Sequence, residues 1–286
     1  MNSTSTKKLT DKTSNTIAFI GGGNMAASLI GGLVADGYDP KHITVSDPDS
    51  DKLARLAARF AIRSAADNSS AVERADVLIL AVKPQVLKTV AHDLVPLVQK
   101  VRPLVISIAA GVREQEIQSW LGGGLPLVRT MPNTPAMIQA GATVLHAGEG
   151  VSQEQRDLAE SILRAVGLTQ WVDDEQKMDA VTALSGSGPA YFFLVMEAME
   201  QAGIEMGLPT DTARLLTLQT ALGAARMAME SSDGPGTLRE KVTSPGGTTE
   251  RALGILQEGE LEALFNKALT GARERSIELS ELLGSE

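Results

Sequence analysis

The residues best suited to chemistry near the N-terminal end form a glycine-rich turn, Gly21-x-Gly23-x-x-Ala26. The turn follows the apolar run Ile17–Ile20 and precedes apolar residues at helical spacing. In such a turn Gly21 permits the sharp bend, Gly23 admits a pyrophosphate beside the backbone, and the small Ala26 lets the helix lie close to the strand. Free N–H groups and the helix dipole then favour the anion. The pattern predicts a dinucleotide site rather than a glycine-rich corner without a ligand.

A carboxylate follows the next apolar run, where dinucleotide sites place one. Asp47 comes directly after Ile43–Ser46, and in NAD enzymes this residue accepts a hydrogen bond from the adenosine ribose. A carboxylate here repels the 2′-phosphate of NADP by about 1–2 kcal/mol when it is partly exposed. We therefore expect NADH to be used well. Lys52 or another nearby base would restore NADPH binding.

A second turn suited to an anion lies towards the C-terminal end. The segment Ser244–Gly247 contains a proline and two glycines, and the pattern predicts that a helix starts at Thr248. Consecutive N–H groups in such a turn can point one way, at the positive end of the helix, with the hydroxyls of Thr248 and Thr249 beside them. A small carboxylate would suit this site. The alternative is an ordinary helix start with Thr248 as the N-cap.

The elements that must position these turns alternate between strands and helices from Thr16 to Val172. The apolar patterns predict strands at Ile17–Ile20, Ile43–Ser46, Asp76–Val82, Leu104–Ala109, Leu127–Met131, Ala142–His146 and Leu168–Val172, and helices at Ser50–Phe60, Glu114–Leu121 and Ser152–Val166. This order is typical of an α/β Rossmann-type doubly wound sheet, which binds its ligand at the carboxyl ends of the strands. Lys83 follows one such end and could contact the cofactor, although on its own a solvated lysine before a proline-induced turn is the favoured explanation.

Beyond Asp173 the sequence predicts helices and no convincing strand. A long helix should start at Ser187–Pro189, and its stretch Phe192–Met199 is apolar on nearly every side, which predicts burial all round. The segment Leu215–Ala225 carries no charge. Helices with such faces are expected to pack against another copy of the chain. We predict a disordered leader at 1–15, a dinucleotide-binding Rossmann domain at 16–172, and a helical dimerisation and substrate-binding domain at 173–286.

The composition fits an enzyme of the cytoplasm. The 286 residues are 43% hydrophobic and can bury a sizeable core. The net charge of −9 does not attract nucleic acid or anionic membranes. The absence of cysteine excludes disulfides and thiolate metal sites. The apolar runs are far shorter than the roughly 20 residues that span a bilayer. His42, His92 and His146 lie far apart without metal-ligand spacing, so we expect no metal site.

Five motifs occur in order between Ile17 and about Leu282. They are Ile-Gly-Gly-Gly-Asn-Met25, Ala-Val-Lys-Pro84, Met-Pro-Asn-Thr-Pro135, Leu-Ser-Gly-Ser-Gly-Pro-Ala190 and Leu-Arg-Glu-Lys-Val-Thr-Ser-Pro-Gly-Gly-Thr-Thr249. Together they resemble the signatures of the pyrroline-5-carboxylate reductases. The resemblance implies reduction of 1-pyrroline-5-carboxylate to L-proline by NADPH or NADH, the last step of proline biosynthesis. It also implies a homodimer through the helical domain, and often a decamer of five dimers.

The resemblance also assigns site residues. It places the cofactor on the glycine turn and on the loops at the strand ends, namely Gly21, Gly22, Gly23, Asn24, Met25, Asp47, Asn68, Ala81, Val82, Lys83, Pro84 and Ala110. It places the substrate carboxylate on the second turn, at Ser244, Gly246, Gly247 and Thr248. The resemblance also implies that Thr249 lies near the ring nitrogen as the catalytic residue.

The chemistry agrees with these residue types. Hydride moves from C4 of the reduced nicotinamide to C5 of the cyclic imine, so the protein must align two rings and favour the iminium form. A hydroxyl such as that of Thr249 can bond the ring nitrogen while water supplies protons. Related reductases of β-hydroxy acids use a lysine on the long interdomain helix, and Pro189–Gly207 contains neither lysine nor arginine. The alternatives are another NAD(P)H-dependent cyclic imine reductase and a nucleotide-sensing regulatory protein without turnover.

Overall fold

The computed structural model describes residues 15–285, so the predicted leader lies outside the described residues apart from Asn15. The chain forms two compact units. One contains residues up to Gly186 together with those from Ala272 onward, and the other contains Ser187–Gly271. The predicted boundary after Val172 does not coincide with this division, because residues 173–186 belong to the first unit.

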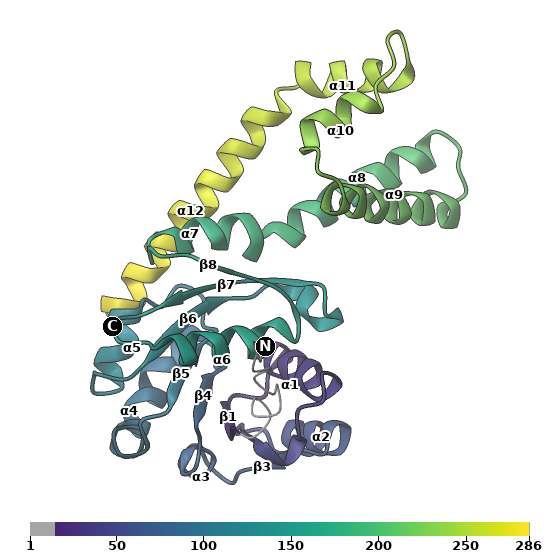
Figure 1. The fold of residues 1–286 in the computed structure, drawn as a ribbon. Helices are drawn as coiled ribbons and strands as arrows, with labels where there is room; N and C mark the ends of the chain where they lie inside the picture. The colour runs from purple at the N-terminus through teal and green to yellow at the C-terminus, as the bar shows by residue number, and fades with distance from the viewer. Residues whose placement is uncertain (1–14, 286) are drawn as a thin grey trace, which may run out of the picture. The chain divides into compact units, whose positions relative to one another are not determined.

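The first unit is built on an eight-stranded sheet in the order β3-β2-β1-β4-β5-β6-β7-β8 (Figure 1). β7 runs antiparallel to β6, and every other neighbouring pair is parallel. The order reverses beside β1, which lies between β2 and β4, so this is the switch point where such sheets bind ligands. The strands are β1 (Ile17–Ile20), β2 (Ile43–Ser46), β3 (Arg63–Ser64), β4 (Val77–Leu80), β5 (Leu104–Ser107), β6 (Leu127–Met131), β7 (Gly141–Ala147) and β8 (Gly167–Trp171).

Helices cover both faces of this sheet, which explains the continuous apolar runs of the central strands. Alternate residues of β1 belong to different cores: Ile17 and Phe19 join one, and Ala18 and Ile20 join the other. The first core also takes side chains from α1, α2 and α6, and the second from α3, α4 and α5. The helices are α1 (Asn24–Ala35), α2 (Ser50–Phe60), α3 (Asn68–Val72), α4 (Pro84–Val101), α5 (Glu114–Trp120), α6 (Gln153–Arg164) and α7 (Lys177–Val181). The predicted Rossmann-type fold is confirmed.

Two predicted strands are shorter in the structure. The runs Asp76–Val82 and Leu104–Ala109 were expected to be extended throughout, but β4 ends at Leu80 and β5 at Ser107. Pairing explains both ends, because β4 and β5 run in register from Val77 opposite Leu104 to Leu80 opposite Ser107. The residues after these ends form loops at the carboxyl edge of the sheet.

The second unit is helical, as predicted. α8 (Gly188–Glu205) and α9 (Thr210–Glu230) lie side by side (Figure 1). They are followed by α10 (Pro235–Lys241), α11 (Thr248–Glu258) and the first part of α12 (Leu261–Ser285). The two long helices approach closely because Gly203 faces Ala213, which is 2% exposed. α12 starts in this unit, and from Ala272 it belongs to the first. No helix in the described part of the chain is both long and apolar enough to cross a membrane.

The prediction that Phe192–Met199 is buried on all sides is wrong for a single chain. Phe192, Phe193 and Leu194 are 67%, 63% and 66% exposed. The small side chains at the α8–α9 contact bury little apolar surface. Most apolar side chains of α8 are therefore not packed against other residues of their own unit and remain exposed to solvent. An exposed apolar surface of this extent marks a surface for association.

Candidate active site

Gly21 makes the turn at the end of β1 possible. Its φ is +100°, and an added Cβ would lie 2.6 Å from the carbonyl oxygen of Ala81. Its N–H donates to the carbonyl of Ser46 at 2.8 Å, so the turn is tied to the ends of both β2 and β4. By contrast, a Cβ at Gly23 would meet nothing within 4 Å. Gly23 is the N-cap of α1, and no side chain caps the helix there. The N–H groups of the first turn of α1 are thus not capped by a side chain, and an anion would bind there.

Asp47 organises the same loop from the end of β2. Its carboxylate accepts the N–H of Gly22 at 2.8 Å and that of Asp49 at 2.9 Å, and Nζ of Lys52 lies 3.0 Å from both oxygens. Partial burial opposes the charged form. The two N–H donors and the lysine outweigh that effect and lower the pKa of Asp47. The carboxylate is therefore ionised and held in place at neutral pH.

The other predicted cofactor residues gather at the same edge of the sheet. Ile20 pairs in register with both Ser46 and Leu80, and Leu80 pairs with Ser107, so four parallel strands end in one row. The loops after these ends therefore lie together. Asn24 and Met25 open α1, Asn68 opens α3, Ala81 and Val82 follow β4, Lys83 is the exposed N-cap of α4, Pro84 is its first residue, and Ala110 follows β5.

The side chain of Asn68 is held by a hydrogen bond to the end of β2. Its Oδ1 accepts the Ser46 hydroxyl at 2.8 Å, which ties the start of α3 to the end of β2. Within the described residues nothing pairs with the side chain of Lys83. The structure is therefore compatible with both interpretations of Lys83, a contact to the cofactor and a solvated lysine.

The second turn lies in the helical unit and differs from the expected row of free N–H groups. The N–H of Gly247 donates to the carbonyl of Ser244 at 3.0 Å, and the N–H of Gly246 donates to Oε2 of Glu250 at 2.7 Å. Gly246 has φ +70°, which glycine adopts without strain. Two of the predicted donors are thus already used, one of them by a carboxylate of the protein itself.

The alternative in which Thr248 caps this helix is wrong. Gly247 is the N-cap of α11, and no side chain makes the capping hydrogen bond. Thr248 and Thr249 are the first two residues of the helix. Among the described residues, neither hydroxyl has a hydrogen-bond partner, and Thr249 is the more buried of the two. The N–H groups and hydroxyls of this first turn are therefore available to a ligand.

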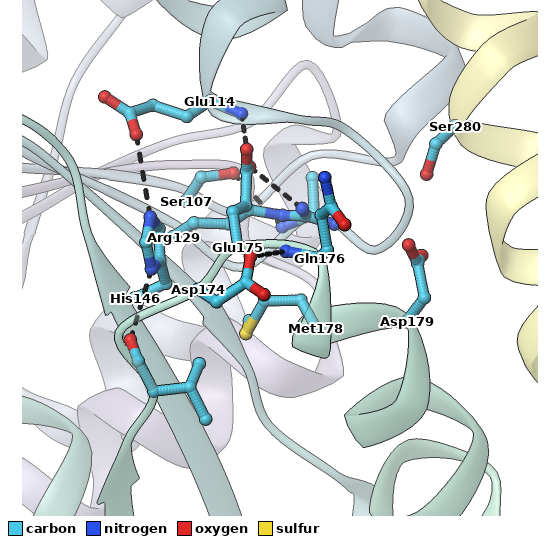
Figure 2. Close-up of polar contacts among 12 residues, drawn as sticks. Ser107, Glu114, Arg129, His146, Asp174, Glu175, Gln176, Met178, Asp179 and Ser280 are labelled. Atoms are coloured by element: carbon cyan, nitrogen blue, oxygen red, sulfur yellow. Dashed lines mark hydrogen bonds and ion pairs between the residues drawn. The ribbon is translucent and has the colours of Figure 1, made fainter.

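The structure also contains a partly buried charged cluster that no sequence pattern indicated (Figure 2). Oε1 of Glu175 accepts from Nη1 of Arg129 at 2.9 Å and from the N–H of Glu114 at 2.6 Å. Nε2 of His146 lies 3.8 Å from Oε2 of Glu114. The cluster joins the start of α5, β6, β7 and the segment before α7. Its members are up to 61 residues apart, so only the fold brings them together. Among residues 15–285 no group of three potential ligands is arranged to hold a metal ion.

Glu114→Gln is expected to stabilise the protein near neutral pH. Burial, and then the charge of Glu175, raise the pKa of Glu114. Between its unfolded and folded pKa values the folded state holds more protons, so this carboxyl lowers the free energy of unfolding as pH rises. Removing it should raise Tm by about 1–3 °C at pH 7, with a smaller effect near pH 4. Calorimetry tests this, with Glu154→Gln, on the exposed start of α6, as the control variant. A lower Tm for Glu114→Gln than for the wild type at pH 7 would contradict the prediction.

Family models match both parts of the chain. Residues 175–279 match the model described as "Pyrroline-5-carboxylate reductase dimerisation", and residues 16–111 match "NADP oxidoreductase coenzyme F420-dependent". The first match supports self-association of the chain through its helical part.

Individual relatives agree over almost the whole chain. The sequence is 52% identical to pyrroline-5-carboxylate reductase of Pseudomonas aeruginosa, across 94% of this chain and 98% of the relative, and 47% identical to that of Pasteurella multocida, across 93% and 98%. A solved pyrroline-5-carboxylate reductase from Coxiella burnetii superposes with a TM-score of 0.90 at 50% identity, across 93% and 98% of the two chains. A Plasmodium falciparum pyrroline carboxylate reductase with NADP bound gives 0.84 at 25% identity, across 94% and 99%. This chain belongs to the pyrroline-5-carboxylate reductase family.

Proposed function

We propose that the protein reduces 1-pyrroline-5-carboxylate to L-proline with NADPH or NADH, the last step of proline biosynthesis. The observation that carries the proposal is 52% identity to a pyrroline-5-carboxylate reductase over 98% of that relative. The glycine turn fits a dinucleotide independently, because a Cβ would clash at Gly21 and would meet open space at Gly23. The reaction therefore has a cofactor site built from this chain's own backbone.

Most of these residues bind the cofactor or the substrate, and Thr249 contacts the nitrogen that is protonated. When bound, the dinucleotide supplies the hydride. The turn Gly21–Met25 holds the pyrophosphate, Asp47 accepts from the ribose, and Asn68, Ala81–Pro84 and Ala110 line the rest of the cofactor site. In the helical unit Ser244, Gly246, Gly247 and Thr248, in the turn before α11 and at its first residue, hold the substrate carboxylate. The hydroxyl of Thr249 bonds the ring nitrogen of the imine, and water supplies the proton.

The test is a nucleotide oxidation assay on the full-length protein. Loss of the absorbance of NADH or NADPH in the presence of 1-pyrroline-5-carboxylate, with L-proline as the product, is the expected result. Faster turnover of larger cyclic imines would identify a different imine reductase. Cofactor binding without turnover of any imine would identify a nucleotide-sensing protein.

Glu250 is expected to weaken substrate binding. Its carboxylate accepts the N–H of Gly246, in the turn proposed to bind the carboxylate of the substrate. Two carboxylates about 4 Å apart in water repel by about 1 kcal/mol. Glu250→Gln should therefore lower KM about three- to tenfold with little change in kcat. Glu258→Gln, at the other end of α11, is the control. A higher KM for Glu250→Gln would show instead that Glu250 shapes the turn for binding.

Self-association is proposed to occur through the long helices, first as a homodimer and then as a decamer of five dimers. Leu215, Leu218 and Leu222 follow one face of α9 and are 68%, 45% and 54% exposed. Burying one such side chain contributes about 1.5–3 kcal/mol, and a two-fold interface contains it twice.

Leu218→Asp is expected to abolish the dimer. Light scattering should give a monomer at micromolar concentration, and activity should fall with the oligomer. Ala58→Asp, on the exposed face of α2, adds the same charge and is the control. A stable, active wild-type monomer would remove the assembly proposal.

The remaining assignments are also proposals. By function, residues 16–172 are assigned to the cofactor and residues 173–286 to dimerisation and substrate binding, whereas the compact units divide at Gly186 and Ala272. The absence of cysteine suits a reducing compartment, so the cytoplasm is the proposed location, and cell fractionation tests it.

A further inference from the structure

We propose that Lys52 is the residue that decides whether this site accepts NADPH. Its ammonium group pairs with Asp47 when the adenosine ribose has a free 2′-hydroxyl. It moves to the 2′-phosphate when one is present. One site thereby takes both cofactors. The inference rests on the proposed cofactor role of the loop after β2 and assigns a role to a residue outside that loop.

The backbone of Lys52 is held in place by the start of α2, whereas its ammonium group is free to move. Asp49 is the N-cap of α2, and its side chain accepts the backbone N–H of Lys52 at 2.9 Å. The position of the residue is thus set by the helix start. The Lys52 side chain is 35% exposed, whereas that of its partner Asp47 is 7% exposed. The ammonium group can leave the Asp47 carboxylate without disturbing the core, because the hydrocarbon part of the Lys52 side chain runs along the surface.

Asp47 does not depend on Lys52 to stay in position. The N–H groups of Gly22 and Asp49 bond the carboxylate directly. When the lysine moves away, two donors remain on the anion. The cofactor loop therefore keeps its shape in both positions of the lysine, as a site with two cofactors requires.

A 2′-phosphate on a ribose held by Asp47 would lie close to Lys52. A ribose hydroxyl that donates to Asp47 lies about 2.7 Å from the carboxylate. A phosphate carried on the ribose at that point is only one or two bonds further away. Nζ of Lys52, already 3.0 Å from both carboxylate oxygens, needs only a rotation of its own side chain to contact it.

The charges explain why the lysine decides the outcome. A carboxylate close to a phosphate opposes binding, and an ammonium group at a similar distance offsets that repulsion with the opposite sign. With Lys52 present the two effects nearly cancel. Without it the repulsion from Asp47 acts alone. Within the described residues Lys52 is the basic side chain bonded to Asp47, and Arg59, further along α2, lies over the ring of Phe60 instead.

Nucleotide fragments test this without catalysis. Calorimetric titration of the full-length protein with 2′,5′-ADP and with 5′-AMP separates the contribution of the 2′-phosphate from that of the rest of the nucleotide. Lys52→Met should weaken 2′,5′-ADP binding about 10- to 100-fold and change 5′-AMP binding less than about threefold. Asp47→Asn should strengthen 2′,5′-ADP binding. Lys41→Met, an exposed lysine just before β2, is the control for general surface charge.

Three outcomes would overturn the proposal. The first is unchanged 2′,5′-ADP binding in Lys52→Met. The second is an equal loss of affinity for 2′,5′-ADP and 5′-AMP in that variant, which would indicate that the Lys52–Asp47 ion pair only supports the loop. The third is a wild-type protein that binds neither fragment. The titrations contain no imine. A protein that shows the expected nucleotide pattern but does not reduce 1-pyrroline-5-carboxylate therefore contradicts the proposed reaction and leaves the role of Lys52 standing.

Discussion

Thr249→Val is expected to lower kcat/KM for 1-pyrroline-5-carboxylate about 10- to 150-fold, with an unchanged Tm. Losing one hydrogen bond to the reacting nitrogen costs roughly 1.5–3 kcal/mol in the transition state. The positive end of α11 disfavours a cationic iminium, so the hydroxyl and the bound carboxylate must offset it. Steady-state kinetics with NADH affinity as a second measurement checks the prediction.

The structure sharpens this test, because Thr249 does not cap its helix. Gly247 is the N-cap, and the Thr249 hydroxyl has no partner among the described residues. A valine should therefore leave stability unaffected. Thr248→Val is the matched comparison: it removes a neighbouring hydroxyl but keeps the backbone N–H, so its kinetic loss should be smaller. Normal kinetics in folded Thr249→Val would remove the catalytic assignment.

Gly21→Ala is expected to destabilise the protein by about 3–5 kcal/mol and to abolish cofactor binding. A φ of +100° is strained for alanine by about 1–3 kcal/mol. In addition, the new Cβ would lie 2.6 Å from a backbone oxygen of Ala81, which cannot rotate away as a side chain would. The glycine turn must then move away from the loop that follows β4. Thermal unfolding should show a Tm lower by at least 6 °C, on the scale of about 2–4 °C per kcal/mol for a chain of this size.

Gly23→Ala separates the structural role of a glycine from its binding role. Gly23 has φ −69°, and a Cβ there meets nothing within 4 Å. The variant should keep its Tm but bind NADH and NADPH more weakly, because the methyl group occupies space that the pyrophosphate needs. A Gly21→Ala variant with wild-type Tm and affinity, or a Gly23→Ala variant as unstable as Gly21→Ala, would contradict this account of the turn.

The sequence was sufficient to predict the elements whose signals are local. β1, β2, β6 and α2 have the predicted bounds, since apolar runs, helical spacing and turn residues mark them directly. β3 was missed because its two residues, Arg63 and Ser64, are exposed and polar. It exists only because β2 offers a free edge on which to pair. The ends of β4 and β5 likewise follow from pairing.

The candidate site was predictable only in part. The glycine turn and Asp47 follow from mechanical requirements on each residue, and the structure brings them together. The engagement of Gly246 by Glu250 depends on a side-chain rotamer, and the cluster around Glu175 depends on contacts between distant segments. The wrong prediction of burial for Phe192–Met199 has a different origin. Apolar periodicity shows that a surface avoids water but does not identify which chain covers it.

The division of α12 between the two units has a consequence for how the protein is made. The first unit is interrupted at Gly186 and resumes at Ala272. In the returning segment Ser276 and Ser280 are buried, and the Ser276 hydroxyl donates to Asp179 at 2.7 Å. During synthesis the N-terminal unit therefore emerges without one of its packing partners, and its native contacts remain incomplete until residues 272–285 have left the ribosome. The helical insertion, which is continuous in sequence, can form its own contacts first, against the usual order in which N-terminal domains fold before those that follow.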